Sequence, residues 1–286
     1  MSRNNSKRNK VRQVLLLLIL IILVIIFVFP FLWMISTSLK RGPDVYSTVP
    51  SLIPRDHKTG DIYVTLENYE YVLTRKNLAR AFLNSVIVVV IVVPLKLLFD
   101  SLAAYSFARI NFPGKQTIFM ILLSSMMVPG IALLIPRVIV TQKLGMMDSL
   151  SGLIFPMAIS IMDIFLLRQF FLSLPPELEE AAMMDGAGRF RIFLQIILPL
   201  SKPVLAVVTI TSFIWHWNDL TWPLVVLTNP KLYTLPLSLA FLQGGLTGRS
   251  YYIMAGATIS VLPIIIVFLI FQKRIIQGFT FTGLKG

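Results

Sequence analysis

The sequence contains no cysteine among its 286 residues and only two histidines, His57 and His216. Without cysteine the chain has no disulfide, no thiolate metal ligand and no cysteine nucleophile. The two histidines are far apart in the sequence, which argues against a metal site. The glycine cluster most similar to a phosphate-binding loop, residues 244–250, lacks the lysine and the preceding strand that such a loop needs. We therefore expect no cofactor bound by this chain and no enzymatic activity of its own.

Charged residues are also scarce, at 14% of the chain, while 56% of residues are hydrophobic and the mean hydropathy is +0.80. These values exclude a typical soluble globular domain and indicate a protein that crosses the membrane several times. The net charge of +13 is a property that nucleic-acid-binding proteins share. However, the basic residues flank apolar runs instead of forming one patch, as topology determinants do. We predict a lipid bilayer as the surroundings and no nucleic-acid partner.

Apolar runs of spanning length predict an all-α integral membrane protein with six transmembrane helices. The first run follows a basic tail (1–13) and no cleavage site follows it, so we read it as a retained span and not a signal peptide. With the N-terminus in the cytoplasm, six crossings also place the C-terminal tail (273–286) there. The expected spans are Val14–Ile35, Phe82–Ala104, Thr117–Val140, Leu150–Phe171, Val204–Leu227 and Tyr251–Phe271.

The distribution of basic residues supports this orientation. Fourteen Lys and Arg residues fall on expected cytoplasmic segments and eleven on outer ones, but seven of the eleven lie in the long outer loop 36–81. Charge has less influence on topology in a long loop. In that loop Thr65 is expected to cap a short helix over residues 66–73.

A polar segment between the fourth and fifth runs predicts two short helices. Pro175 and Pro176 suit the first turn of a helix, and the glutamates that follow favour its positive end. Gly186 can end that helix, and Asp185 is expected to cap a second one over residues 187–197. The small residues at this bend allow another protein to approach closely, so we expect a docking element.

This segment carries a family resemblance. The residues Glu180-Ala181-Ala182-x-x-Asp185-Gly186-Ala187, followed by Phe193 and Pro199, resemble the EAA loop of membrane subunits of bacterial ABC importers. Further motifs resemble the carbohydrate-importing branch and its maltose-type second permease, among them Leu66-Glu67-Asn68-Tyr69, Trp217-Asn218-Asp219, Trp222-Pro223-Leu224 and the terminal Gly283-Leu284-Lys285-Gly286. Phe281-Thr282 is a minor departure from that pattern.

The resemblance implies a type I ABC importer permease fold, with residues 82–272 as a five-helix transmembrane core and residues 172–203 as its cytoplasmic coupling loop. It implies one homologous permease subunit, two cytoplasmic ATPase subunits that use ATP and Mg, an extracytoplasmic solute-binding protein and a sugar substrate, in the bacterial inner membrane. The residues implied in ATPase coupling are Glu180, Ala181, Ala182, Asp185, Gly186, Ala187, Phe193 and Pro199.

Ionisable residues inside spans are costly and are functional candidates by default. Lys96 and Asp100 are spaced i, i+4, so they can neutralise each other on one helix face. Asp163 is within reach of Arg168 only by a longer path, and a pathway role and a packing role remain equally open. His216 is expected to be a hydrogen-bonded packing residue.

The fifth span carries an aromatic and polar cluster that can line a sugar pathway, because sugars stack on aromatic faces and offer hydroxyls to Asn and Asp. The alternative is an interfacial aromatic belt. The candidates are Trp215, Trp217, Asn218, Asp219 and Trp222. Pro129 and Gly130 in the third span are expected to cause a plain kink. The outer loop 228–250 is expected to be turn-rich, and the resemblance implies that Gly244 and Gly245 in it contact the binding protein.

Other functions fit the sequence less well. An ABC permease for a different solute, such as a glycerol phosphodiester, remains open. An ion-coupled secondary transporter would need coupling acids at mid-span, for which only Asp100 and Asp163 are available, and no internal repeat is visible. A lipid-head-group transferase would need paired aspartates downstream of Asp185, and none precede Asp219.

Overall fold

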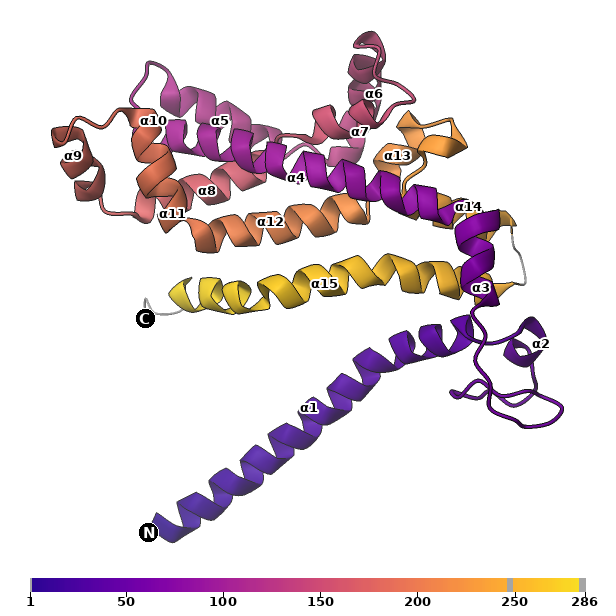
Figure 1. The fold of residues 1–286 in the computed structure, drawn as a ribbon. Coiled ribbons are helices and arrows are strands. Elements are labelled where there is room, and N and C mark those ends of the chain that lie inside the picture. The colour runs from indigo at the N-terminus through magenta and orange to yellow at the C-terminus, as the bar shows by residue number, and fades with distance from the viewer. Residues whose placement is uncertain (1, 246–248, 283–286) are drawn as a thin grey trace. The chain divides into compact units, whose positions relative to one another are not determined.

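The computed structural model describes residues 2–245 and 249–282, with side chains over 12–245 and 249–272. In this part of the chain the secondary structure is helical (Figure 1), apart from an isolated bridge between Arg55 and Ile62. The all-helical prediction is therefore confirmed. Several positions named above lie outside the described residues. They are most of the basic side chains of the tails 1–13 and 273–286, the terminal motif 283–286, and Gly248.

Three helices are long and apolar enough to cross a membrane without a break. They are α1 (Ser2–Ser38), α4 (Leu78–Arg109) and α15 (Ser250–Thr282), which contain the first, second and sixth expected spans. The apolar runs between them form bent helix pairs, so the described residues hold three spans, or up to six if each bent pair counts as one.

The third expected span is broken, and the prediction of a plain kink is wrong. Helix α5 (Lys115–Ser125) ends before Pro129, and the chain resumes as the short 3₁₀ turn η2 (Gly130–Leu133) and α6 (Leu134–Lys143), bent by 100° from α5. Pro129 has no amide donor and disfavours helix in the residue before it. At about 1.5 Å per residue, the 11 residues of α5 cover about half of a bilayer core.

The fourth and fifth spans are also interrupted. Helix α7 (Leu150–Ile154) with η3 (Phe155–Met157) meets α8 (Ile161–Ser173) at 41°. The prediction of one fifth helix over 204–227 is wrong beyond Trp217, where α12 (Lys202–Trp217) ends and a separate α13 (Thr221–Val226) follows. The Asp219 carboxylate accepts the amide of Trp222 at 3.2 Å, which satisfies a donor in the first turn of α13 and favours a new helix start.

The segment 228–250 is more regular than its prolines and glycines suggest. After the 3₁₀ turn η5 (Pro230–Leu232), α14 (Leu235–Gly245) forms an 11-residue helix, so the turn-rich prediction is wrong here. Pro236 lies in the first turn, where a missing amide costs nothing. The Ser85 hydroxyl accepts the Leu235 amide at 2.8 Å, and this contact fixes the start of the helix.

The loop after α1 contains α2 (Gly42–Val45), α3 (Glu67–Glu70) and the π-helical turn η1 (Tyr71–Arg75). The short helix expected over 66–73 is thus present, although Leu66 and not Thr65 is its N-cap residue. Thr65 Oγ1 accepts the Glu67 amide at 3.3 Å. Asn68 is buried and donates to the carbonyls of Ser38 and Lys40, at 2.8 Å each, which ties α3 to the end of α1.

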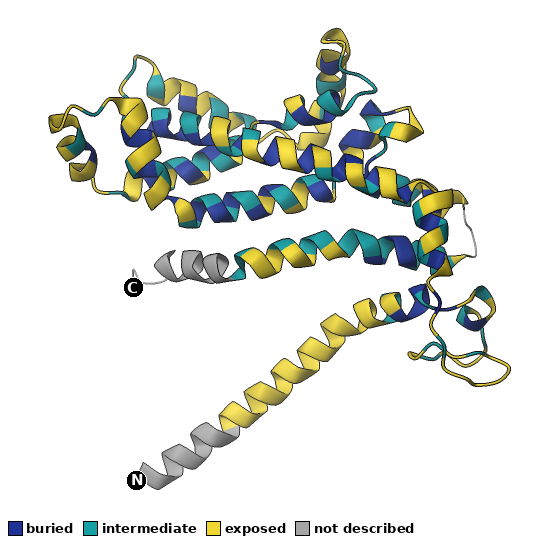
Figure 2. Cartoon of the chain, viewed as in Figure 1, coloured by how far each residue is buried: buried dark blue, intermediate teal, exposed yellow. Residues whose placement is uncertain are grey.

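The chain forms two compact units. The first comprises Met1–Ala79 with Leu239–Leu262, and the second comprises Arg80–Ser238 with Pro263–Gly286. The second unit has an aromatic and aliphatic core that includes Tyr105, Phe107, Phe119, Phe171, Phe193 and Val208, from α4, α5, α8, α12 and the segment between α10 (Arg189–Ile192) and α11 (Leu198–Leu200). Figure 2 shows buried and exposed residues interleaved along α4 and α12, whereas α9 (Glu177–Met184) is mostly exposed.

Candidate functional site

The segment predicted as a docking element forms two helices that meet at Asp185–Gly186, as expected. Helix α9 (Glu177–Met184) is followed by α10 (Arg189–Ile192), the π-helical turn η4 (Phe193–Ile197) and α11 (Leu198–Leu200). Gly186 has φ +79°, its amide bonds the Met183 carbonyl at 3.0 Å, and the Ala187 amide bonds the Ala182 carbonyl at 2.9 Å. This pair of bonds is a Schellman motif, which closes α9.

The prediction that Asp185 caps the second helix from Ala187 is wrong. Asp185 is the C-cap residue of α9, and the second helix begins at Arg189 with Gly188 as its N-cap. The reason is the Schellman motif: it uses the amide of Ala187 to close α9, so the next helix starts two residues later.

The predicted coupling residues divide into an exposed bend and a buried base. Glu180, Ala181, Asp185, Gly186 and Pro199 are exposed, and Ala182 and Ala187 are half-buried. Phe193 is 1% exposed, and its ring centroid lies 5.2 Å from that of Tyr105. The bend therefore presents small residues outward, while Phe193 packs the loop onto α4.

Sequence reasoning missed the residue that fastens this loop, Glu179. Its side chain is buried, with Oε1 3.0 Å from Arg109 Nε and Oε2 3.4 Å from Arg189 Nη1. The Tyr105 hydroxyl also donates to Oε2 at 3.3 Å. The available signal was helical phase: adjacent helix positions differ by about 100°, so Glu179 and the exposed Glu180 face different sides.

The second unit also contains a cavity of about 630 Å³, a size typical of small-molecule sites. Trp215, Asp219 and Trp222 line it, as do His216 and Arg137. Trp215 is the exposed aromatic among them, with 71% of its surface accessible. Three of the five predicted pathway residues are thus brought together at one cavity.

The other two predicted pathway residues lie elsewhere. Trp217 is buried, and its ring packs against Phe82 at 5.6 Å and Phe213 at 5.7 Å between centroids. Asn218 is exposed, and its amide donates to the Ile214 carbonyl at 2.8 Å. Neither contributes to the cavity lining. Both therefore have the geometry of packing and helix-end residues.

A charged cluster forms part of the cavity wall. Lys96 Nζ lies 2.7 Å from Asp163 Oδ2 and 3.7 Å from Asp100 Oδ2, and the Ser212 hydroxyl is 3.4 Å from Asp163. The i, i+4 pairing of Lys96 with Asp100 is confirmed, but the shorter contact, to Asp163, was not predicted. Arg168 instead donates to the Phe107 carbonyl at 3.0 Å.

Trp222 and Arg137 form another part of the wall. The Trp222 indole donates to the Gly152 carbonyl at 3.0 Å, and the Arg137 guanidinium lies 5.4 Å from the indole ring centre. This contact places a cation at the cavity and covers the Trp222 ring, which is 2% exposed. The exposed Trp215 ring can stack on a sugar ring, while Arg137 can donate to hydroxyls and Asp219 can accept from them.

Three of the interruptions in the helices meet at this cavity. The chain leaves helical conformation at residues 126–129, 158–160 and 218–220, and Gly130, Ile159, Ser160 and Asp219 at or beside these breaks line the cavity. Irregular backbone at membrane depth is tolerated where it is buried in protein or lines a water-filled cavity. The breaks are therefore placed where a polar solute would need exposed backbone groups.

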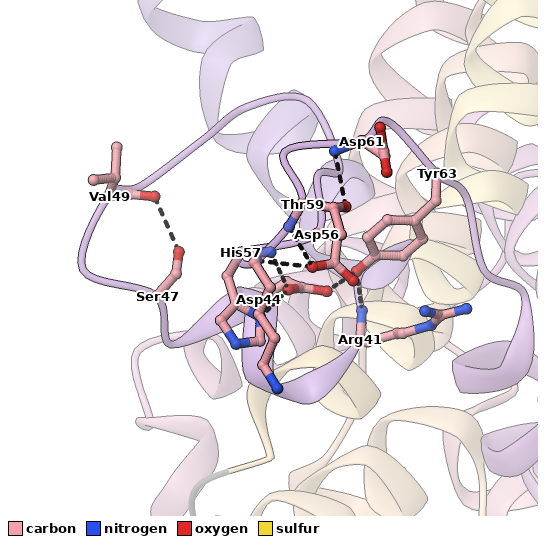
Figure 3. Close-up of polar contacts among 10 residues, drawn as sticks. Arg41, Asp44, Ser47, Val49, Asp56, His57, Thr59, Asp61 and Tyr63 are labelled. Carbon is pink, nitrogen blue, oxygen red and sulfur yellow. Dashed lines mark hydrogen bonds and ion pairs between the residues drawn. The ribbon is translucent and has the colours of Figure 1, made fainter.

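In the first unit, a hydrogen-bonded cluster surrounds Asp44 (Figure 3). Asp44 Oδ1 accepts the His57 amide at 2.8 Å and contacts His57 Nδ1 at 2.6 Å, and the Tyr63 hydroxyl donates to Oδ2. Burial would raise the pKa of Asp44, but the hydrogen bonds from Tyr63 and His57 outweigh it and lower the pKa below its ordinary value. Burial, opposed by the Arg41 amide and reinforced by donation to Asp44, raises the pKa of Tyr63 to about 12.

Asp44, Asp56 and His57 each place one possible ligand atom within 4.8 Å of the others. The expectation of no metal site rested on the separation of the two histidines and overlooked aspartates beside His57. Asp56 Oδ1 accepts the amides of Lys58 and Thr59 at 2.8 and 3.2 Å, and donors engage both Asp44 oxygens. The arrangement is that of a carboxylate satisfied by hydrogen bonds. Gly244 and Gly245, in the same unit, are exposed at the end of α14.

Comparison with known proteins gives a family match over most of the chain. Residues 73–280 match the family model described as "Binding-protein-dependent transport system inner membrane component". The arabinooligosaccharides transport system permease protein AraQ of Halalkalibacterium halodurans is 34% identical over 259 residues, covering 90% of this chain and 91% of AraQ. The trehalose/maltose transport system permease protein MalG of Thermococcus litoralis is 35% identical over 282 residues, covering 96% of this chain and 98% of MalG.

A solved structure is similar over nearly the whole chain. It is a chain from the crystal structure of a bacterial ABC transporter involved in the import of the acidic polysaccharide alginate. The TM-score is 0.81 at 26% sequence identity, and the match covers 94% of this chain and 98% of that one.

Proposed function

Because this chain belongs to the family of binding-protein-dependent transport system inner membrane components, we propose that it forms half of a translocation pathway for a sugar or oligosaccharide. As a family member it is a multi-pass permease subunit of an ABC importer in the inner membrane and not an enzyme. The ATP and Mg that drive transport belong, in this proposal, to separate ATPase subunits.

The topology that fits best has six spans in the type I importer arrangement. They are α1, α4 and α15, the bent pairs α5–α6 and α7–α8, and a fifth span that begins with α12, because α10 and α11 belong to the loop before it. Both termini and the α9–α10 loop lie in the cytoplasm. The excess of basic residues on these segments supports this orientation. The loop 36–81 and α14 then face the outside.

The observation that carries the substrate pathway is the meeting of helix breaks at the cavity of about 630 Å³. Its wall offers one accessible indole face, from Trp215, with Asp219 and Arg137 as polar partners, while the Trp222 ring is buried beneath Arg137. A polyhydroxylated ring suits such a wall because its C–H faces stack on aromatics while its hydroxyls bond both charges. Relatives named for arabinooligosaccharide, galactooligosaccharide and trehalose/maltose transport support a sugar over other solutes.

The bend between α9 and α10 receives the motion of the ATPase. Its exposed residues, Glu180, Ala181, Asp185 and Gly186, fit a groove on an ATPase subunit, with Glu180 paired to a basic residue there. Two of the three glutamates in the first turn of α9, Glu177 and Glu180, are exposed, and the last turn has no basic residue, so the exposed side of α9 carries negative charge. The full complex contains this chain, a homologous permease, two ATPases and an extracytoplasmic binding protein that meets the exposed end of α14 at Gly244 and Gly245.

Two substitutions at Gly186 test the docking. Tryptophan there should leave the protein level in the membrane unchanged while uptake is lost and ATP hydrolysis no longer responds to solute. Asparagine is the matched control, because it tolerates the left-handed conformation and remains small. Unchanged transport in Gly186→Trp would contradict the docking, since bulk at an engaged bend must interfere.

Uptake of labelled maltotriose, arabinotriose and galactotriose tests the substrate. Trp215→Ala should slow uptake of the accepted sugar about fivefold, because stacking contributes on the order of 1 kcal/mol. Ile214→Ala, on the same helix and outside the cavity lining, should transport normally. Uptake that survives ATP depletion with ion gradients intact would identify a secondary transporter and refute the proposal.

A further inference from the structure

Helix α9 is held by an unusual anchor. Among its eight residues only Glu179 is buried, and it is 4% exposed. A short surface helix normally attaches through an apolar stripe. Here the attachment of α9 runs mainly through a carboxylate that forms ion pairs, supplemented by the half-buried Ala182, which packs against the core.

Arg109 links that carboxylate to two other elements. It is the last residue of α4, and while its Nε faces Glu179, its Nη2 donates to the carbonyls of Phe171 and Leu174 at 2.7 and 2.5 Å. These carbonyls lie at the end of α8, where the last helix carbonyls lack i+4 partners, and the Phe171 carbonyl also accepts the Leu174 amide at 3.3 Å. One guanidinium therefore holds the ends of α4 and α8 together with α9, through two hydrogen bonds to the carbonyls and an ion pair to Glu179.

The other end of this connection is at the cavity. Helix α4 continues from Arg109 back to Lys96, 13 residues earlier (109 − 96), which is about 20 Å along a helix. Lys96 lines the cavity and binds Asp163 of α8. Helices α4 and α8 are thus joined by charge both at the coupling loop and at the cavity wall.

We propose that the Glu179–Arg109 pair is the joint that transmits movement of α9 to the cavity, with the segment of α4 between Lys96 and Arg109 as the rigid lever. Glu179 is a positioning residue: it contacts neither solute nor ATPase and acts through Arg109. The inference rests on the proposed docking of α9 to an ATPase subunit. In this division of roles the exposed Glu180 meets the ATPase, and the buried Glu179 carries the force inward.

The absence of cysteine makes a direct test possible, because each introduced cysteine is the only one in this chain. Met184→Cys reports docking, since Met184 is 88% exposed at the end of α9. Ile131→Cys reports the cavity, since Ile131 lines it and is 71% exposed. Each reporter is labelled with a water-soluble maleimide in the native complex, purified through a tag on this chain, with and without ATP, Mg²⁺ and vanadate.

In the parent complex, ATP with vanadate should slow labelling of Met184→Cys and change the labelling rate of Ile131→Cys by at least about fivefold, the lower range of allosteric coupling. Adding Glu179→Gln should keep the protection of Met184→Cys and reduce the change at Ile131→Cys to less than about twofold, because glutamine keeps the size and removes the charge. Glu179→Asp keeps the charge and should restore part of the response. Glu177→Gln, on an exposed position of the same helix, should behave as the parent.

The outcomes separate the two ideas. No protection of Met184→Cys in the parent would refute the docking itself, and with it the proposed function. Protection in Glu179→Gln with a full response at Ile131→Cys would overturn the joint alone, as would a parent cavity that does not respond to ATP. A Glu179→Gln chain that reaches the membrane but loses the ATPase would also overturn it, because the pair would then serve docking and not transmission.

Discussion

Lys96 is a position where a single substitution should strongly destabilise this protein. Its side chain is 7% exposed, and its ammonium group faces two carboxylates, Asp163 at 2.7 Å and Asp100 at 3.7 Å. The Asp100 side chain is fully buried and that of Asp163 is 15% exposed. Lys96→Met keeps the length and apolar stem of the side chain but leaves the buried carboxylate of Asp100 and the half-buried one of Asp163 without this cation.

The magnitude follows from the cost of uncompensated buried charge. Removing one partner of a buried ion pair destabilises a protein by about 3–5 kcal/mol. That is a large part of a total stability on the order of 5–15 kcal/mol. For a domain of this size each kcal/mol lowers Tm by about 2–4 °C, so Lys96→Met should lower it by about 10 °C.

The assay compares melting of purified variants in one detergent, followed by tryptophan fluorescence. The matched control is Lys143→Met, which removes the same charge at an exposed position and should stay within about 0.5 kcal/mol of the parent. The decisive variant combines Lys96→Met with Asp100→Asn and Asp163→Asn. Replacing all members of a buried charge cluster is often neutral, and the amide oxygen introduced by Asp100→Asn can still accept the Ser160 amide that Asp100 accepts at 3.0 Å.

Two results would refute this reasoning. If Lys96→Met melts with the parent, the three charged groups do not depend on one another. If the triple variant is as unstable as the single one, the loss comes from packing or from the attraction itself, and the unpaired carboxylates are not its cause.

Three further predictions concern other parts of the chain. Gly152→Ala should destabilise the second unit by at least about 2 kcal/mol in the same melting assay, because its Cβ would lie 2.1 Å from the Met146 carbonyl oxygen, whereas Gly188→Ala, with nothing within 4 Å, should be tolerated. Because the pKa of Asp44 is lowered, its contribution to the stability of the 36–66 segment is complete above an ordinary aspartate pKa of about 4 and is lost as pH falls below that value. Proteolysis of that segment should therefore accelerate in acid. The variant Asp44→Asn should remove this pH dependence. Because the pKa of Tyr63 is raised to about 12 from 10.0, its contribution to the stability of the same segment is complete below pH 10 and is lost as pH rises through about 12. Hydrogen exchange of the segment should therefore show an extra increase in rate near pH 12. The variant Tyr63→Phe should not show this increase.

Features fixed by neighbouring residues could be predicted from the sequence. The bend of the coupling loop follows from Pro175, Pro176 and Gly186, whose backbone preferences act locally. The ion pair between Lys96 and Asp100 follows from helix periodicity alone. The three long helices follow from uninterrupted apolar runs.

Features fixed by residues far apart in the sequence could not be predicted from it. Asp163 pairs with Lys96, which lies 67 positions earlier in the sequence (163 − 96). Nothing in the residues around Asp163 indicates that its partner is Lys96 and not Arg168. The sequence could not say which members of the aromatic and polar cluster on the fifth span face the cavity. The structure places Trp215 at the cavity and Trp217 in the core. Hydrophobicity is equal on both sides of such a helix, because lipid and protein interior are similarly apolar, so periodicity gives no sign of which face is which.

The same property of the bilayer explains why charge holds the working parts of this chain. Between helices in lipid there is no hydrophobic driving force, so association depends on close packing and polar contacts. Contacts of this kind have defined lengths and directions, and Lys96 and Arg109 place them near the two ends of one stretch of α4. Pro94 lies just before Lys96 and removes a helical hydrogen bond there, so α4 is expected to yield at that point and to move as a unit beyond it. The stretch of α4 from the turn weakened by Pro94 to the Arg109–Glu179 ion pair has the geometry of the lever proposed above. That geometry depends on the positions of Lys96 and Arg109 along the helix.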